Sequence, residues 1–177
     1  LKDVELKPKP YRTPRPTIWV GGPTNTAAVR RVAKWGLEGF AGRPSPAMYE
    51  KYKQLCQEYN TEPKAQSQSL FFGHCSDDPE KAYAEAGKYG QWQWSWYRNW
   101  WWNYGRTTSM GNELREDYIF GDPEMWIKEM ERRMAGNPPI DHAFVLGQLP
   151  GIPHEMMMRS MQLFAKKVLP HFQNKPA

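Results

Sequence analysis

The sequence predicts an α/β fold in which parallel strands alternate with helices. Three observations predict it. Short β-branched and aromatic runs alternate with longer stretches whose apolar residues recur at helical spacing. Residues that cap helices stand at the start of those stretches. The 177 residues hold four such units, half of the eight in a (βα)8 TIM barrel. Crossovers between parallel strands are right-handed, so we expect the strands to be neighbours in one sheet with their helices on one side.

The first unit follows a connector, residues 1–16, in which four prolines favour extended backbone. Residues 17–21 are β-branched and aromatic before they reach a glycine pair, and we predict a strand there. Thr and Asn side chains at 24–26 can cap the helix that follows. The apolar residues of that helix share one face: Ala28, Val29, Val32, Ala33 and Trp35.

The same order recurs twice in the next stretch of chain. A strand is predicted at residues 37–41, followed by a helix over 47–60 that begins at Ser45-Pro46. The next strand is predicted at residues 64–72, and a helix opens at Asp78-Pro79. These two units continue the alternation that parallel βαβ folds require.

The chain then departs from this order before the last unit. Residues 90–120 are rich in Trp and have no clean period, so we predict an insertion or lid. A helix begins at Asp122-Pro123, and the last strand is predicted at 142–146. The final helix starts at Pro153 and stops before Pro170. We treat residues 1–177 as one partial barrel domain.

Composition excludes several classes of protein. The net charge is +5, but basic and acidic residues are interspersed, so we expect no nucleic-acid partner. No apolar run reaches the length of a membrane span, and we expect no membrane partner. Cys56 and Cys75 have no metal-ligand spacing, so we expect no metal and a reducing, cytoplasmic location. Because Leu1 is not an initiator Met, we expect the sequence to begin within a longer protein.

Four segments, in this order, resemble the C-terminal half of the bacterial luciferase-like family of flavin-dependent monooxygenases. They are the strand entry at 14–22, the helix and strand at 33–40, the helix start at 120–124 and the last helix at 160–170. The third segment has Asp122 where the family has Thr. The resemblance implies the last four βα units of a (βα)8 barrel, with a Trp-rich insertion after the third strand present.

The resemblance also implies an activity. Such enzymes use reduced FMN and O2 to oxygenate an organic substrate, here expected to be apolar or aromatic, and a flavin reductase is a candidate partner. A sibling branch uses a deazaflavin to transfer hydride, and the residues do not decide between the two. The alternative from another class is a half barrel that associates with itself and catalyses nothing. The catalytic residues are unknown.

The turn after the first strand is the best candidate for cofactor binding. Its glycines let the backbone approach a ligand, and free N–H groups at a helix N-terminus favour a phosphate. An ordinary tight turn with a cap would have the same residues. The resemblance implies that the turn receives the cofactor phosphate through Gly21, Gly22, Thr24, Asn25 and Thr26. Arg43, after the second strand, either binds an anion or is a solvated loop residue.

The Trp-rich segment holds six tryptophans in eleven residues, which is too much apolar surface to leave in water. We interpret it either as a wall or lid of the substrate pocket or as packing between helices or at a subunit interface, and we expect a homo-oligomer. Trp94, Trp101 and Arg106 are the candidate substrate residues. Polar residues of the strand at 64–72 suggest a polar cavity on one of its faces. His74, just beyond that strand, is expected to be a surface loop residue.

Overall fold

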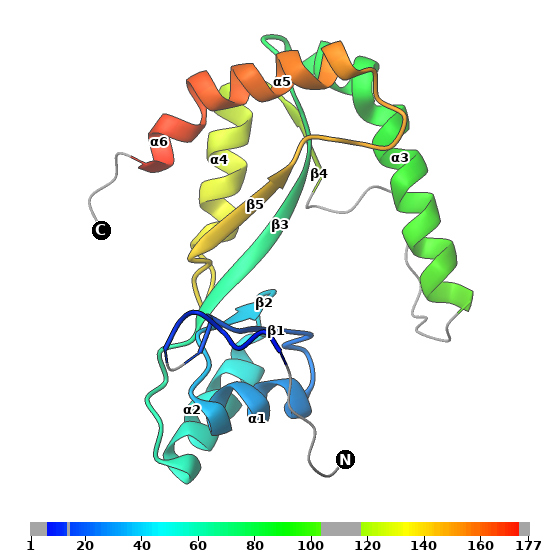
Figure 1. Ribbon diagram of the computed structural model, residues 1–177. Helices are drawn as coiled ribbons and strands as arrows, with labels where there is room; N and C mark the ends of the chain where they lie inside the picture. Colours follow the sequence, from blue (N-terminus) through cyan, green and yellow to red (C-terminus); the bar gives the residue numbers. More distant parts are fainter. Residues whose placement is uncertain (1–6, 14, 104–117, 174–177) are drawn as a thin grey trace. The chain divides into compact units, whose positions relative to one another are not determined.

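The computed structural model describes residues 7–13, 15–103 and 118–173, without the side chains of 100–103 (Figure 1). The chain divides into two compact units, with the boundary between Gln68 and Ser69. The described strands have the order β1-β2-β3-β4, and β5 also pairs with β3. The fold is therefore α/β with a sheet whose printed pairs β1–β2, β2–β3 and β3–β4 are all parallel.

Unit 1 contains two complete βα units. Strand β1 (Trp19–Gly21) leads to helix α1 (Thr26–Trp35), and β2 (Gly39–Ala41) leads to α2 (Pro46–Tyr59). Strands β1 and β2 are parallel, and β2 pairs in parallel with the first residues of β3. These elements lie where the sequence predicts them, so the prediction for the first two units is confirmed.

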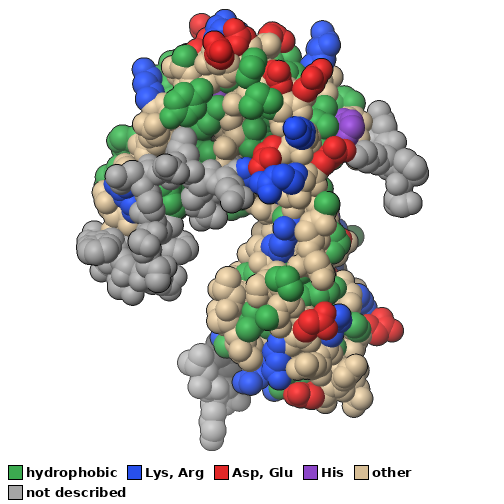
Figure 2. Space-filling model, turned by 180° about the vertical axis from the view of Figure 1, so that it is seen from behind, with side chains coloured by type: hydrophobic (Ala, Val, Ile, Leu, Met, Phe, Trp, Pro, Cys, Tyr) green, Lys and Arg blue, Asp and Glu red, His purple; other side chains and the backbone are tan. Residues whose placement is uncertain are grey.

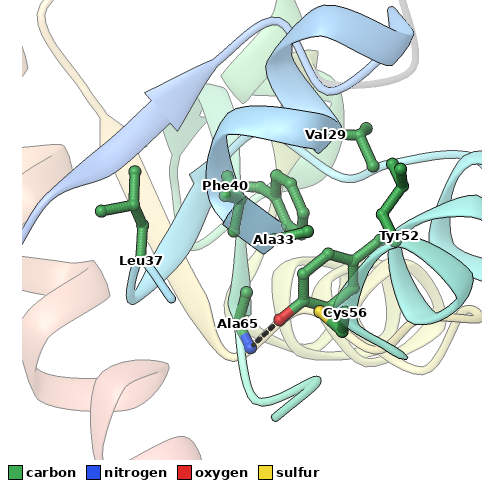
Figure 3. Close-up of a cluster of buried hydrophobic side chains, with 9 residues drawn as sticks. Val29, Ala33, Leu37, Phe40, Tyr52, Cys56 and Ala65 are labelled. Atoms are coloured by element: carbon green, nitrogen blue, oxygen red, sulfur yellow. Dashed lines mark hydrogen bonds between the residues drawn. The ribbon is translucent and has the colours of Figure 1, made fainter. Parts of the chain in front are cut away.

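Capping side chains and a small core hold unit 1 together. Asn25 and Ser45 are the N-caps of α1 and α2, and their side chains accept hydrogen bonds from Ala28 and Met48. Figure 3 shows the core between the two helices and β2, where the hydroxyl of Tyr52 accepts a 3.0 Å hydrogen bond from the backbone N–H of Ala65. The buried members of this core are Val29, Val32, Ala33, Leu37, Phe40, Tyr52, Leu55, Cys56 and Ala65.

Unit 2 begins within β3 (Gln66–Cys75). The elements that follow are α3 (Pro79–Asn103), β4 (Tyr118–Gly121), α4 (Pro123–Met134), β5 (His142–Leu146), α5 (His154–Lys167) and α6 (Leu169–Gln173). Residues Phe72–Cys75 of β3 pair in parallel with β4. The helix starts at Asp78-Pro79 and Asp122-Pro123 and the strand at 142–146 are confirmed.

Two features of this unit go beyond the sequence analysis. Helix α3 takes in residues 90–103 of the segment predicted as an insertion or lid, and Gly90 packs so closely beside Phe120 that an added Cβ would lie 2.7 Å from its ring. Strand β4 at 118–121 was missed, since four residues are too few to display a period of two. The described part of the chain therefore has one strand more than predicted.

Helices cover both faces of β3 and β4, which corrects the expectation that all helices lie on one side of the sheet. Phe71 and Cys75 pack with Ile119 against α4 and the C-terminal helices. Phe72 packs with Tyr118 against α3, on the opposite face (Figure 1). Side chains alternate across a strand, so consecutive residues of β3 enter different cores.

Candidate functional site

Hydrogen bonds within the turn after β1 fix the conformation of its backbone. The backbone N–H and the side-chain Nδ2 of Asn25 both donate to the carbonyl oxygen of Gly22, at 3.3 Å and 3.0 Å. Gly22 has φ of +71°, a conformation that favours glycine. A Cβ added at Gly21 would meet nothing within 4 Å. The backbone of Gly21 therefore faces open space that a ligand can enter, whereas an added Cβ at Gly22 would lie 3.4 Å from Nδ2 of Asn25.

The turn after β2 lies directly beside it. β1 and β2 are parallel neighbours with Gly21 opposite Ala41, so both strands end at the same edge. Gly42, with φ of +130°, packs so closely on the Pro23 ring that a Cβ there would lie 3.2 Å from it. Arg43 follows, with a half-buried side chain. The fold thus brings Arg43 close to the predicted phosphate turn.

The electrostatics of these two turns favour an anion. Helices α1 and α2 have no acidic residue in their first turn, whereas α3, α4 and α5 have Glu80, Glu124 and Glu155 there. A helix N-terminus carries partial positive charge, which a glutamate would otherwise satisfy. Burial lowers the pKa of Arg43 from its ordinary value, yet an arginine keeps its charge at neutral pH.

The side chains of Thr24 and Thr26 complete the turn. Thr24 is exposed and Thr26 half-buried, and neither hydroxyl makes a hydrogen bond within the described ranges. All six cofactor residues proposed from the sequence therefore lie on two adjoining turns at one end of β1 and β2.

The Trp-rich segment is part of helix α3, and its members face different ways. Trp94 is 5% exposed and belongs to the core with Phe72, Tyr118 and Leu149. It is therefore placed to pack against β3 and β4. Trp92 and Trp96 are 52% and 62% exposed, and their rings lie 5.8 Å apart. The Trp101 side chain and Arg106 lie outside the described residues.

Sequence analysis missed the groove beside this helix. One cavity of about 410 Å³ is lined by Trp92, Gln93, Trp96, Tyr97 and Pro150. Another of about 430 Å³ shares Trp92 and Pro150 and adds Lys88, Tyr89 and Gly151. The signal was present in the sequence as a helical repeat, since residues 88, 92 and 96 are four apart, but residues 90–120 were interpreted as having no clean period.

His74 is a buried strand residue, which corrects the expectation of a surface loop histidine. It lies in β3, and its Nε2 is 3.3 Å from Oε2 of Glu85 on α3. Burial lowers the pKa of His74, Glu85 raises it, and Arg159 lowers it again. Nδ1 is buried, with no hydrogen-bond partner in the described ranges. The neutral imidazole is therefore the favoured form.

The other polar residues of β3 differ in their burial. Ser67 is buried, Ser69 and Gln68 are half-buried and Gln66 is exposed. Cys75 is also buried, and its pKa is raised to about 12 by burial and by Asp122 and Asp77, so it is no nucleophile at neutral pH.

The described ranges contain neither a metal-binding cluster nor a helix that could span a membrane. Within them, no three His, Cys, Asp or Glu side chains come close enough to hold a metal ion. None of the described helices combines the length and apolar character needed to cross a membrane. Figure 2 shows Lys and Arg side chains intermingled with Asp and Glu on the face of unit 2 that it presents.

Comparison with known proteins identifies the class of fold. No family model matches the sequence, and no curated protein matches it significantly. Among solved structures, the monooxygenase RslO1 from Streptomyces bottropensis superposes with a TM-score of 0.68 at 16% identity over 94% of this chain and 51% of its own. Apo-MsnO8 superposes with a TM-score of 0.58 at 12% identity over 99% of this chain and 55% of its own.

These likenesses define the fold alone, because the identities are low. The chain spans about half the length of the structures that it matches. The particular fold is thus one that a monooxygenase shares, and it includes both the turns of unit 1 and the strands and helices of unit 2. Activity, cofactor and substrate do not follow from this likeness.

Proposed function

We propose that this chain is part of a flavin-dependent oxidoreductase, a luciferase-like monooxygenase that uses reduced FMN and O2 on an apolar or aromatic organic substrate. One arrangement carries the proposal: two adjoining turns with an open Gly21, a half-buried Arg43 and two helix N-termini without acidic residues, on a fold that a monooxygenase shares. This combination suits the phosphate of FMN better than an uncharged ligand.

Each residue of the two turns has a distinct task in this proposal. Backbone N–H groups at Gly21 and Gly22 and at the start of α1 donate to phosphate oxygens. The hydroxyls of Thr24 and Thr26 add donors, and Asn25 keeps the turn in shape through its bonds to Gly22. Arg43 supplies a positive charge and paired donors. When bound, reduced FMN would supply the electrons with which O2 is activated.

The barrel is a further part of the proposal. The parallel pairs β1–β2, β2–β3 and β3–β4 are consistent with half of a (βα)8 barrel whose ligand binds at the carboxyl ends of the strands. Leu70, Phe144 and Leu146 are exposed on the sheet, which favours association of the chain with a homologous copy. Cys56 and Cys75 are buried free thiols, as expected for a cytoplasmic protein. A flavin reductase would deliver the reduced cofactor.

Titration of the 177-residue chain with oxidised FMN, reduced FMN and a deazaflavin tests this proposal. We expect quenching of flavin fluorescence on binding, and weaker binding after Gly21→Val. The Cβ of a valine at Gly21 would meet no protein atom within 4 Å, and the side chain would fill the space that the phosphate would take. Gly22→Val is a poorer test because φ of +71° strains any side chain there.

Arginine variants provide the matched control. Arg43→Gln should weaken FMN binding about tenfold, since a charged hydrogen bond to phosphate is worth roughly 1.5–3 kcal/mol. Arg31→Gln removes the same charge from an exposed position of α1 and should leave binding unchanged. Equal effects of the two variants, or binding of riboflavin as tight as that of FMN, would contradict a phosphate site. Tighter binding of the deazaflavin would move the proposal to the hydride-transfer branch.

A further inference from the structure

Helix α3 presents aromatic side chains on the face that is not buried. Ala82, Ala86 and Trp94 enter the core of unit 2. Among the described side chains of the helix, the exposed aromatic residues are Trp92, Trp96 and Tyr97 toward its C-terminal end and Tyr83, which packs edge-on against Phe120. Exposed aromatic residues that gather on one element usually mark a binding surface.

A loop turns this face into a groove. Leu149 is buried in the same core as Phe72, which fixes the loop next to the helix. Pro150 lines both cavities, and Gly151, with φ of +81°, lies against the ring of Tyr89. The groove therefore has a preformed wall opposite the tryptophans. From Lys88 to Tyr97 it follows the helix for about 14 Å, at about 1.5 Å per residue.

The groove has one positive end. Lys88 lines it, with Nζ 4.9 Å from the centroid of the Tyr89 ring. Within the described residues, no carboxylate lies within ion-pairing distance of this ammonium group. The ammonium group of this exposed lysine can pair with a negative group of a ligand at that end.

The middle of the groove has a fixed hydrogen-bond donor. The hydroxyl of Tyr118 donates to Oε1 of Gln93 at 2.8 Å, which orients the side-chain amide. The amide N–H groups of Gln93 have no acceptor in the described part of the chain. They are available to a carbonyl or ether oxygen of a ligand.

We infer that this groove, formed by α3 and the 149–151 loop, binds a planar aromatic anion, with its ring system in contact with the mutually tilted rings of Trp92 and Trp96 and its negative group at Lys88. Each cavity has the volume of a small-molecule site, and stacking on indole rings selects flat ligands. The inference deepens the proposed function by naming the site and charge of its substrate, and it rests on that function only for the role of the ligand as substrate.

Fluorescence anisotropy with anthracene-2-carboxylate as the probe tests the inference without any flavin. We expect saturable binding to the 177-residue chain, and binding about tenfold weaker after Trp92→Ala or Trp96→Ala, since stacking on one aromatic side chain is worth about 1–3 kcal/mol. Lys88→Gln should weaken binding of the carboxylate severalfold but leave binding of the neutral anthracene-2-carboxamide unchanged. Circular dichroism establishes that each variant is folded.

The matched control is a second exposed tryptophan beside a lysine. Trp35 on α1 is 66% exposed with Nζ of Lys34 5.5 Å from its ring, but neither residue lines these cavities. Trp35→Ala and Lys34→Gln should leave probe binding unchanged. The inference is overturned if these variants weaken binding as much as those of the groove, if decanoate displaces the probe equally well, or if the probe does not bind. Self-association that Trp92→Ala abolishes, without probe binding, would assign the groove to a second copy of the chain.

Flavin titration on the same variants separates the two ideas. If FMN binds and the anthracene probe does not, only the groove is wrongly assigned. If the probe binds and FMN does not, the groove stands and the proposed cofactor falls. Trp92→Ala should leave FMN affinity unchanged, because the turns of unit 1 contain no residue of α3.

Discussion

The imidazole of His74 on β3 lies against the carboxylate of Glu85 on α3, with 3.3 Å between Nε2 and Oε2. The neighbouring charges are Lys81, which lies 3.7 Å from the other oxygen of Glu85, and Arg159 of α5. The buried ring therefore ties the strand to the helix that carries the tryptophan groove. Its protonation should influence the stability of unit 2.

We predict that unit 2 loses stability as the pH falls below about 6.5, the ordinary pKa of histidine. Burial lowers the pKa of His74 in the folded state. Below pH 6.5 the unfolded chain is therefore protonated at this histidine while the folded chain is still neutral there, which favours unfolding. The stability that neutral His74 contributes to unit 2 is complete above about pH 6.5. It is lost between that pH and the lower pKa that His74 has in the folded state. Urea unfolding between pH 8 and pH 5 measures it, with His74→Gln as the comparison. An identical pH dependence in wild type and variant would contradict the prediction.

Phe71 and its neighbour Leu70 form a matched pair on β3. Phe71 is fully buried between β3 and α4, whereas Leu70 is 45% exposed. Phe71→Ala should lower the free energy of unfolding by about 3–5 kcal/mol, because it leaves a cavity in the core. Leu70→Ala should cost less than about 1 kcal/mol. Chemical denaturation of both variants checks this, and similar losses would mean that the burial pattern of β3 is wrong.

Gly73 is the glycine least tolerant of a side chain. It has φ of +148°, and an added Cβ would lie 1.7 Å from the carbonyl oxygen of Ile119 on β4. Gly73→Ala must therefore push β3 and β4 apart, with a loss of several kcal/mol or failure to fold. Gly21→Ala, at a position with open space, should be neutral. A Gly73→Ala variant with an unchanged melting temperature would refute the close pairing of these strands.

Glu38, which follows the end of α1, is hydrogen-bonded to Arg15 at the end of the connector. It accepts 2.8 Å hydrogen bonds from Arg15 and from the N–H of Ile18, and Arg15 lowers its pKa to about 2. Its contribution to stability is present above about pH 4.5 and is lost as the pH falls toward 2. Both side chains are about one-third exposed, so Glu38→Gln should cost only about 1 kcal/mol at pH 7. Faster hydrogen exchange at Ile18 would reveal the released connector, and unchanged exchange would contradict the tether.

Local sequence signals were sufficient where a cap and a periodic stretch coincided. Ser45-Pro46 and Asp122-Pro123 begin helices as predicted, because caps act through neighbouring backbone atoms. Elsewhere the structure depends on contacts between residues far apart in the sequence, which local patterns do not reveal. Gly90 does not end α3, since Phe120 packs beside it, and nothing near Gly90 in the sequence records that contact. The contact of Pro150 and Gly151 with the groove on α3 is likewise long-range, and nothing near α3 in the sequence records it.

The same distinction between local signals and long-range contacts applies to the residues of the candidate site. The turn at 21–26 could be placed from its own glycines and caps, whereas the closeness of Arg43 depends on the pairing of two strands. His74 was placed on the surface because the sequence after Phe72 offers no sign that the strand continues to Cys75. Its partner Glu85 lies eleven residues away on another element.

Strand β3 gives hydrogen bonds to β2 through its first residues and to β4 through its last four. If unit 1 unfolds, the start of this strand loses its neighbour and exposes unpaired backbone groups, which favours fraying toward the pairing with β4. The two units should therefore melt in a single cooperative transition or in closely coupled ones. A change in either core would then shift the melting temperature of the other, although the only backbone that they share is one strand.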